Sequence, residues 1–177
     1  MIVAPPSSGI PHLYSSKLYL RPLIALDEAR YVSLFTDPEI MEHVGSPMGK
    51  IDAASAFSAT LGMMSKSPPD AWLWIACDRT GGQEVGLFGL VMREGRYEIG
   101  AMVLEEHQGR GFAYEALSCV RDFGFAQLRL AAQFGRQLAS NRRSVGLMLK
   151  LGFEQVPDGP RSVHWQLDRA VWASRLR

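Results

Sequence analysis

The stretch HQGRGFAYEAL, residues 107–117, decides how the rest of the sequence is interpreted. Its two glycines, Gly109 and Gly111, stand one residue apart, and a row of helix-forming residues follows directly. Apolar residues then recur at helical spacing as far as Leu128, which predicts a helix from about residue 111 to residue 127. The first N–H groups of a helix lack intrahelical acceptors and carry the positive end of its dipole. The turn therefore predicts an anion site made of backbone amides.

A glycine pair alone is weak evidence, and by itself it favours a simple turn from strand to helix at Gly109 and Gly111. The stretch lacks the Gly-Lys-Ser/Thr sequence of a P-loop, so no lysine and hydroxyl are placed for a γ-phosphate and magnesium. It also lacks the third glycine and the short βαβ unit of a dinucleotide-binding fold. We therefore expect a different anion.

Composition predicts one soluble domain of α/β type. The chain has 177 residues, of which 47% are hydrophobic and 21% charged, enough for one well-filled core. A net charge of +1 favours neither a nucleic acid nor a membrane as partner. The first sixteen residues do not read as a signal peptide, and no run of about eighteen apolar residues occurs, so a cytoplasmic location is expected. Cysteines and histidines show no metal-site spacing, and His107 is expected to be a solvated loop residue.

Residues 1–16, rich in Pro, Ser and Gly, predict a flexible N-terminal arm, and residues 17–177 a single domain. Within the domain, alternating or β-rich runs predict strands at 17–23, 72–77, 84–92, 96–104, 130–138, 153–156 and 162–167. Helices are expected from Asp27 as N-cap to about residue 37, at 38–44, at 51–64, at 111–127 and from Asn141 to Gly152. This order predicts a mixed sheet covered by helices.

Gln108, Gly111 and Ala113 match the Q/R-x-x-G-x-G/A signature of the GNAT superfamily of acyl-CoA N-acyltransferases, which the sequence resembles. The segments LYLRPL, DPEIMEHVG, YEIGAMVLEEHQGRGFAYEAL and NRRSVGLMLKLGFEQV extend the resemblance over residues 17–168, toward the ribosomal-protein N-terminal acetyltransferases. The resemblance implies an α/β (α+β) fold: a mostly antiparallel mixed sheet of about seven strands. Helices would cover both faces, and the fourth and fifth strands would splay apart at the centre.

The resemblance also implies acetyl-CoA as the acyl donor and no metal. Backbone amides of the signature loop would hold the diphosphate, and the end of the preceding strand would pair with the pantetheine arm like an added strand. Asn141 would bind the arm from the far side, although the sequence equally supports a role as helix N-cap alone. The expected contacts with the cofactor are Met102, Val103, Leu104, Gln108, Gly109, Arg110, Gly111, Phe112, Ala113 and Asn141.

Acetyl transfer from a thioester to an amine requires removal of a proton from the amine, whose pKa is about 10, and a proton for the leaving thiolate. Glu98, on the strand that leads to the signature, is the candidate base, with an edge or surface carboxylate as the alternative. A backbone N–H near Met102 or Val103 would polarise the thioester carbonyl. The resemblance implies Ser144 as the proton donor, and the alternative for Ser144 is an ordinary first-turn helix serine.

We therefore expect an N-acetyltransferase whose acceptor is a primary amine. The acceptor is either a protein N-terminus or a small molecule such as a polyamine, an amino acid or an antibiotic. A non-catalytic acyl-CoA sensor, in which Glu98 and Ser144 do no chemistry, is the alternative from another class. The acceptor walls are expected from loops at residues 37–50 and 156–162, which identify no substrate. The sequence leaves a homodimer open, through a sheet edge or the C-terminal segment.

Overall fold

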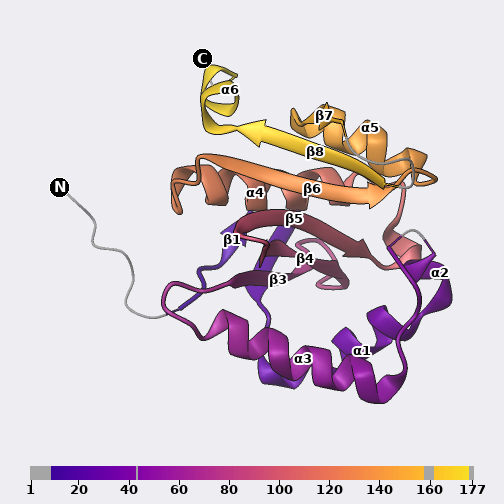
Figure 1. The fold of residues 1–177 in the computed structure, drawn as a ribbon. Coiled ribbons are helices and arrows are strands. Elements are labelled where there is room, and N and C mark those ends of the chain that lie inside the picture. Colours follow the sequence, from indigo (N-terminus) through magenta and orange to yellow (C-terminus); the bar gives the residue numbers. More distant parts are fainter. Residues whose placement is uncertain (1–8, 43, 158–161, 176–177) are drawn as a thin grey trace.

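Eight strands form one sheet with the order β1-β2-β3-β4-β5-β6-β8-β7 (Figure 1). This computed structural model describes residues 9–42, 44–157 and 162–175. The predicted mixed, mostly antiparallel sheet is confirmed. It has one strand more than the sequence indicates, because the two-residue β1 (Leu13–Tyr14) pairs with β2 (Leu18–Pro22).

The segment before β2 differs in part from the predicted arm. Trp74 Nε1 donates a hydrogen bond to the carbonyl of Pro11 at 2.6 Å, and β1 extends the sheet beyond β2. The bond from Trp74 joins positions more than fifty residues apart, and β1 needs the folded sheet beside it. Local composition therefore reveals neither contact. Residues 1–8 of the predicted arm lie outside the described residues.

Strands β3 (Ala71–Asp78), β4 (Glu84–Arg93) and β5 (Arg96–Val103) continue the sheet as an antiparallel meander. The central residues of β3 and β4 are buried because helices cover both faces of these strands. Trp74 belongs to the apolar cluster on one face, and its neighbours Leu73 and Ile75 belong to the cluster on the other. The strands are thus the common wall of two cores.

One core lies between the sheet and the N-terminal helices α1 (Glu28–Thr36), α2 (Pro38–Met41) and α3 (Lys50–Met64). Figure 1 shows α1 and α3 below the strands and α2 beside them. A 3-10 turn, η1 (Ala25–Asp27), precedes α1. Asp27 is the N-cap residue of α1, as predicted, but its side chain makes no capping hydrogen bond to that helix. Its carboxylate accepts hydrogen bonds from the N–H of Ile24 and from Arg21 instead.

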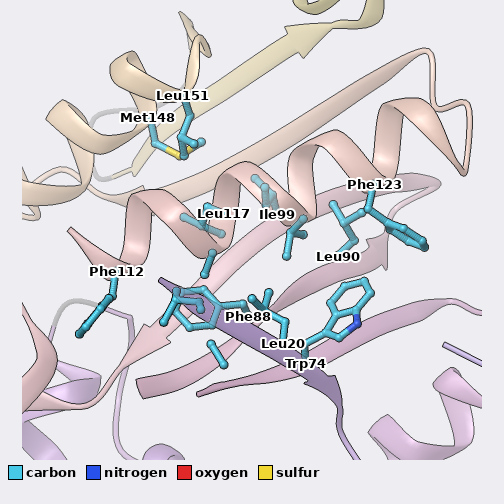
Figure 2. Packing of buried hydrophobic residues seen from close by; sticks show 14 of the residues in the cluster. Leu20, Trp74, Phe88, Leu90, Ile99, Phe112, Leu117, Phe123, Met148 and Leu151 are labelled. Atoms are coloured by element: carbon cyan, nitrogen blue, oxygen red, sulfur yellow. The ribbon is translucent and has the colours of Figure 1, made fainter. Parts of the chain in front are cut away.

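Helix α4 (Phe112–Ala126) crosses the opposite face and buries one side along its whole length. Figure 2 shows Leu117 and Phe123 of α4 facing Trp74, Phe88 and Leu90 on the strands. The helix follows η2 (Glu105–His107) and the glycine turn. Its predicted extent, residues 111–127, is confirmed to within a residue at each end.

The second half of the sheet consists of β6 (Ala132–Leu138), β7 (Glu154–Val156) and β8 (Ser162–Asp168). Helix α5 (Arg142–Leu151) lies between β6 and β7 in the chain, with Asn141 as N-cap and Gly152 as C-cap, as predicted. A short helix that the sequence analysis did not anticipate, α6 (Arg169–Ser174), follows β8. Its Trp172 stacks on Phe125 and donates a hydrogen bond to Asp122 at 2.7 Å.

The two halves meet between β5 and β6, which run parallel and register only at Glu98↔Phe134. Beyond this pair the strands separate, and we call the gap between residues 100–103 and residues 135–138 the seam. The splayed strand pair implied by the resemblance is therefore present. Its fourth and fifth strands are β5 and β6 here, because β1 was not among the predicted strands. On the other edge of β5, Gly86 of β4 lies opposite Val103, where a Cβ would collide with the carbonyl oxygen of Met102.

Candidate functional site

The signature turn lies at the open end of the seam, and its backbone donors are unsatisfied. Gly109 and Gly111 have φ angles of 73° and 82°, in the left-handed region that favours glycine, and no atom lies within 4 Å of a Cβ built at either. The N–H of Gln108 bonds the carbonyl of Glu105, and the N–H of Glu115 bonds that of Gly111. Between these, no N–H of residues 109–114 donates to an acceptor in the described part of the chain. Free N–H donors at the start of a helix are suited to an anion, and we call residues 109–114 the cradle.

Two side chains connect this cradle to the strands and helix beside it. Gln108 Nε2 donates to the carbonyl of Val103 at 3.2 Å, and Arg143 Nη1 of α5 donates to Gln108 Oε1 at 3.3 Å. Gln108 thus spans the open end of the seam from β5 to α5. The guanidinium of Arg143 adds positive charge close to the free amides.

Arg110 and Phe112 lie in the turn with His107. Arg110 Nη1 is 3.2 Å from His107 Nδ1, and the guanidinium carbon lies 4.9 Å from the centroid of the Phe112 ring. His107 is only 3% exposed and meets Phe112 edge-on, so the expectation of a solvated histidine is wrong. The η2 turn folds the imidazole inward under α4, a consequence of tertiary packing that sequence spacing does not indicate.

The edge of β5 that borders the seam presents Val103. The N–H of Leu104 donates to the carbonyl of Val85 on the β4 side. Because neighbouring residues in a strand direct their backbone groups to opposite edges, Val103 faces the seam and Met102 faces β4. The bond from Gln108 to the Val103 carbonyl agrees with this direction. Of the three predicted strand contacts, Val103 alone has its backbone groups on the seam edge.

Asn141 and Ser144 lie across the seam at the start of α5. Asn141 Oδ1 accepts a hydrogen bond from the N–H of Ser144 at 3.1 Å, which confirms its role as N-cap. Its Nδ2 group donates to no acceptor among the described residues, so it remains available to a ligand. Ala113, in the first turn of α4, is half-buried on the other side of the open end.

Glu98 lies at the closed end of the seam, flanked by Val91 of β4 and Phe134 of β6. It is therefore not an edge residue, and its side chain is 22% exposed. Its Oε2 lies 3.6 Å from Arg93 Nε and 3.8 Å from Arg136 Nη2. By strand alternation Glu98 projects to the same face as Met102, the face covered by the N-terminal helices. The carboxylate thus lies where the two strands begin to separate.

The structure adds two features that the sequence analysis did not identify. Glu39 of α2 and Glu105 of η2 come together beside the C-terminal end of β5, and the hydrogen bond and charge of Glu105 raise the pKa of Glu39. Gln137 of β6 is 9% exposed, and its Oε1 has no partner among the described residues. Neither feature has a sequence signal, because each depends on elements that only the fold brings together.

This arrangement fits coenzyme A. The cradle at residues 109–114 offers unpaired amides to a diphosphate, and the strand edge at Val103 offers backbone groups to an amide-bearing arm. Among the described residues no group of three or more His, Cys, Asp or Glu is arranged to hold a metal ion. No helix in the described ranges is long and apolar enough to cross a membrane.

Comparisons with known proteins agree with this geometry. A family model described as an acetyltransferase (GNAT) domain matches residues 17–154. The chain is 27% identical over 150 residues to the uncharacterized N-acetyltransferase YoaA of Bacillus subtilis (strain 168), across 82% of this chain and 84% of YoaA.

Solved structures of similar fold include an acetyltransferase from Agrobacterium tumefaciens, with a TM-score of 0.79 and 24% identity over 93% of this chain and 98% of that one. The spermidine N-acetyltransferase of Vibrio cholerae, solved with CoA and spermine, has a TM-score of 0.76 and 19% identity. The match covers 90% of this chain and 99% of that one. The ribosomal-protein alpha-N-acetyltransferase RimL, in complex with coenzyme A, has a TM-score of 0.74 and 12% identity. The match covers 90% of this chain and 97% of RimL. At these identities the likeness establishes a shared fold.

Proposed function

Because the chain belongs to the GNAT acetyltransferase domain family, we propose that it transfers an acetyl group from acetyl-CoA to a primary amine. One observation carries the proposal: the unpaired amides of residues 109–114 and the open edge of β5 meet at one end of the seam. An anionic diphosphate and an extended amide-bearing arm need these two kinds of backbone site side by side.

The free amides from Gly109 to Ala113 hold the diphosphate, whereas the N–H of Gln108 is bonded to the carbonyl of Glu105. Arg110 and Arg143 contribute positive charge beside the diphosphate. The thioester supplies an activated acyl carbonyl. The N–H of Val103 donates to the arm next to the diphosphate, since the N–H of Met102 faces β4, and the thioester at the far end of the arm lies beyond both amides. Leu104 and Met102 fix the strand through their bonds toward β4, and Asn141 Nδ2 binds the arm from the far side.

Glu98 accepts the proton that the amine loses as its nitrogen attacks the acyl carbon, directly or through water. Its place at the closed end of the seam supports this role, because an arm that starts at the cradle and follows β5 ends there. The bond between the acyl carbon and sulfur then breaks, and Ser144 gives a proton to the leaving thiolate. A protonated amine first releases one proton to solvent, because an ammonium nitrogen has no lone pair with which to attack. The neutral amine then loses one proton to Glu98 while the sulfur gains one from Ser144, so the transfer balances.

The acceptor is an amine that approaches as a cation. A protein N-terminus and a small polyamine both satisfy this condition, and solved structures of this fold include enzymes named for each. A non-catalytic acyl-CoA sensor requires the cradle but neither Glu98 nor Ser144.

Thermal unfolding with acetyl-CoA and with ATP tests the cofactor. Acetyl-CoA at about a hundred times its dissociation constant should add about 2.7 kcal/mol to the free energy of unfolding. ATP carries phosphates but no pantetheine arm, so it should shift the melting temperature much less. Equal shifts with both ligands, or none with acetyl-CoA, would contradict the proposal.

Thiol release from acetyl-CoA across an amine panel separates enzyme from sensor. The panel contains spermidine, amino acids and peptides with free N-termini. The matched control for each compound is its form with every amine acetylated. An enzyme releases thiol only with the free amine. If the protein binds acetyl-CoA but no member of the panel causes thiol release, the protein is the sensor.

A further inference from the structure

Two buried glutamines on β6 share an unusual property. Gln133 is 0% exposed and Gln137 is 9% exposed, and the Oε1 atom of each has no hydrogen-bond partner among the described residues. They stand four residues apart on one strand, so their side chains project to the same face of the sheet. A buried acceptor without a donor is unfavourable, and each therefore needs a physical reason.

Gln133 has a structural reason. It lies beside Phe134, at the closed end of the seam, and its Nε2 donates to the carbonyl of Arg121 in α4 at 2.7 Å. A Cβ on Gly124 would collide with its amide, so the side chain fills the space between β6 and α4. Gln133 thus ties the strand to the helix at a position before β5 and β6 separate.

Gln137 lies at the open end, where β6 has left β5. Its Nε2 donates to the carbonyl of Asn141 at 3.3 Å. Because a carbonyl only accepts hydrogen bonds, this contact fixes the orientation of the amide and turns Oε1 away from Asn141. The acceptor atom is thus held in place, buried and without a donor.

The face to which Gln137 projects borders the seam. A Cβ on Gly135, between the two glutamines on the same face, would lie 3.9 Å from Ile99 Cγ2 of β5 and against Met148 of α5. Ala101 and Val103 of β5 pack on the same apolar cluster. Counted from the pair Glu98↔Phe134 in a parallel register, Gln137 is level with Ala101, across the gap from it.

We propose that Gln137 Oε1 accepts a hydrogen bond from an amide N–H of the pantetheine arm of coenzyme A. This inference rests on the proposed function, since it requires the arm to lie in the seam. β5 contributes backbone groups to one side of the arm, and Gln137 contributes a side-chain acceptor to the other. Gln137 is then a cofactor-binding residue in addition to those on β5, the cradle and Asn141.

Calorimetric titration of Gln137→Met tests the proposal, with Gln133→Met as matched control. Methionine keeps the length of the side chain and removes its amide. Each protein is titrated with coenzyme A and with adenosine 3′-phosphate 5′-diphosphate, which keeps the phosphates but lacks the arm. Gln137→Met should bind coenzyme A about tenfold more weakly and the nucleotide as wild type does. Gln133→Met should bind both ligands as wild type does.

Three outcomes overturn the inference while leaving the proposed function intact. Wild-type affinity for coenzyme A in Gln137→Met means that water satisfies the glutamine. Equal weakening for both ligands assigns the effect to the diphosphate end, and equal weakening in Gln133→Met assigns it to packing. Should Gln137→Met not fold, Gln137→Leu is compared in the same way. A wild-type chain that does not bind coenzyme A overturns the proposed function and this inference together.

Discussion

Strands β4 and β5 pair from Gly86↔Val103 to Arg93↔Arg96, whereas β5 and β6 pair only at Glu98↔Phe134. On its first edge β5 satisfies its backbone groups within the protein, and on its second edge most of them face the seam. The comparison shows how one strand serves both stability and binding. Substitutions on the paired side should reduce stability, and substitutions around the seam should reduce binding or catalysis.

The largest effect is expected at the cradle, from Gly111→Glu. A carboxylate among the free amides would repel the diphosphate, and two unit charges about 4 Å apart near a protein surface interact by roughly 4 kcal/mol. Affinity for coenzyme A should therefore fall by more than about a hundredfold, as measured by calorimetric titration. The fold should persist, because a Cβ at this position meets no atom within 4 Å.

Gly111→Ala is the control for backbone strain at a φ angle of 82°. Alanine in the left-handed region costs about 1 kcal/mol but brings no charge, so it should weaken binding far less than glutamate. If Gly111→Glu bound coenzyme A like wild type in a folded protein, the diphosphate would lie elsewhere.

A smaller effect is expected across the seam, where Ser144→Ala separates chemistry from binding. A proton donor to the leaving thiolate acts only as the bond breaks, so kcat and kcat/KM should fall together, by about a hundredfold. The affinity for acetyl-CoA should stay unchanged. Steady-state kinetics on the amine found in the panel, beside direct titration, gives both quantities.

Asn141→Ala is the companion variant and should weaken cofactor binding first. It also removes the cap of α5, which costs about 1 kcal/mol of stability, whereas Asn141→Asp keeps the capping oxygen. Turnover of Ser144→Ala at the wild-type rate would reduce Ser144 to an ordinary first-turn serine.

The smallest effect on function is expected away from the seam, from Asp27→Asn in η1, whose partner Arg21 also binds Glu84 at the start of β4. The Asp27 carboxylate is buried and receives two hydrogen bonds of 2.8 Å from Arg21. Neutralising it should lower the free energy of unfolding by about 2 kcal/mol in urea titrations and leave the affinity for coenzyme A unchanged. Glu28→Gln, at an exposed neighbouring carboxylate, is the control. A loss of affinity in Asp27→Asn would break the division between stability and binding.

The same carboxylate predicts a dependence of stability on acid. Burial alone would raise the pKa of Asp27, but the hydrogen bonds from Arg21 and from the N–H of Ile24 outweigh it and lower the pKa below its ordinary value of 3.8. Its stabilisation is therefore complete above that pH and is lost as the pH falls through the folded-state pKa. In Asp27→Asn this part of the acid dependence should be absent.

Local signals in the sequence predicted most of the fold. Helix α5 has its cap at Asn141 and its stop at Gly152, and α4 has an uninterrupted apolar face, so both were predictable. The splay of β5 from β6 came from the resemblance, because alternation shows that a segment is a strand but not where its pairing ends. Helix α6 has six residues and is held by Trp172 against Phe125, a contact that only the folded chain makes.

The site divides in the same way. The cradle was predictable because glycines at a helix start have a direct physical meaning, and the cap at Asn141 has one too. The direction of the Val103 N–H, the burial of His107 and the unpaired Oε1 of Gln137 depend on register and packing between distant segments. The charge of Glu105 beside Glu39 likewise requires α2 to lie next to η2.

Gly86 shows that the seam also limits which residues can occupy β4, the strand on the other side of β5. It is buried in β4 and faces the edge of β5 that no ligand reaches, yet any side chain there would push the carbonyl of Met102 and move Val103 with it. The residues tolerated at position 86 are therefore limited by the pantetheine arm, which position 86 does not contact. Along β4, the substitutions that the protein tolerates should depend on the shape of the seam as well as on the packing of the core.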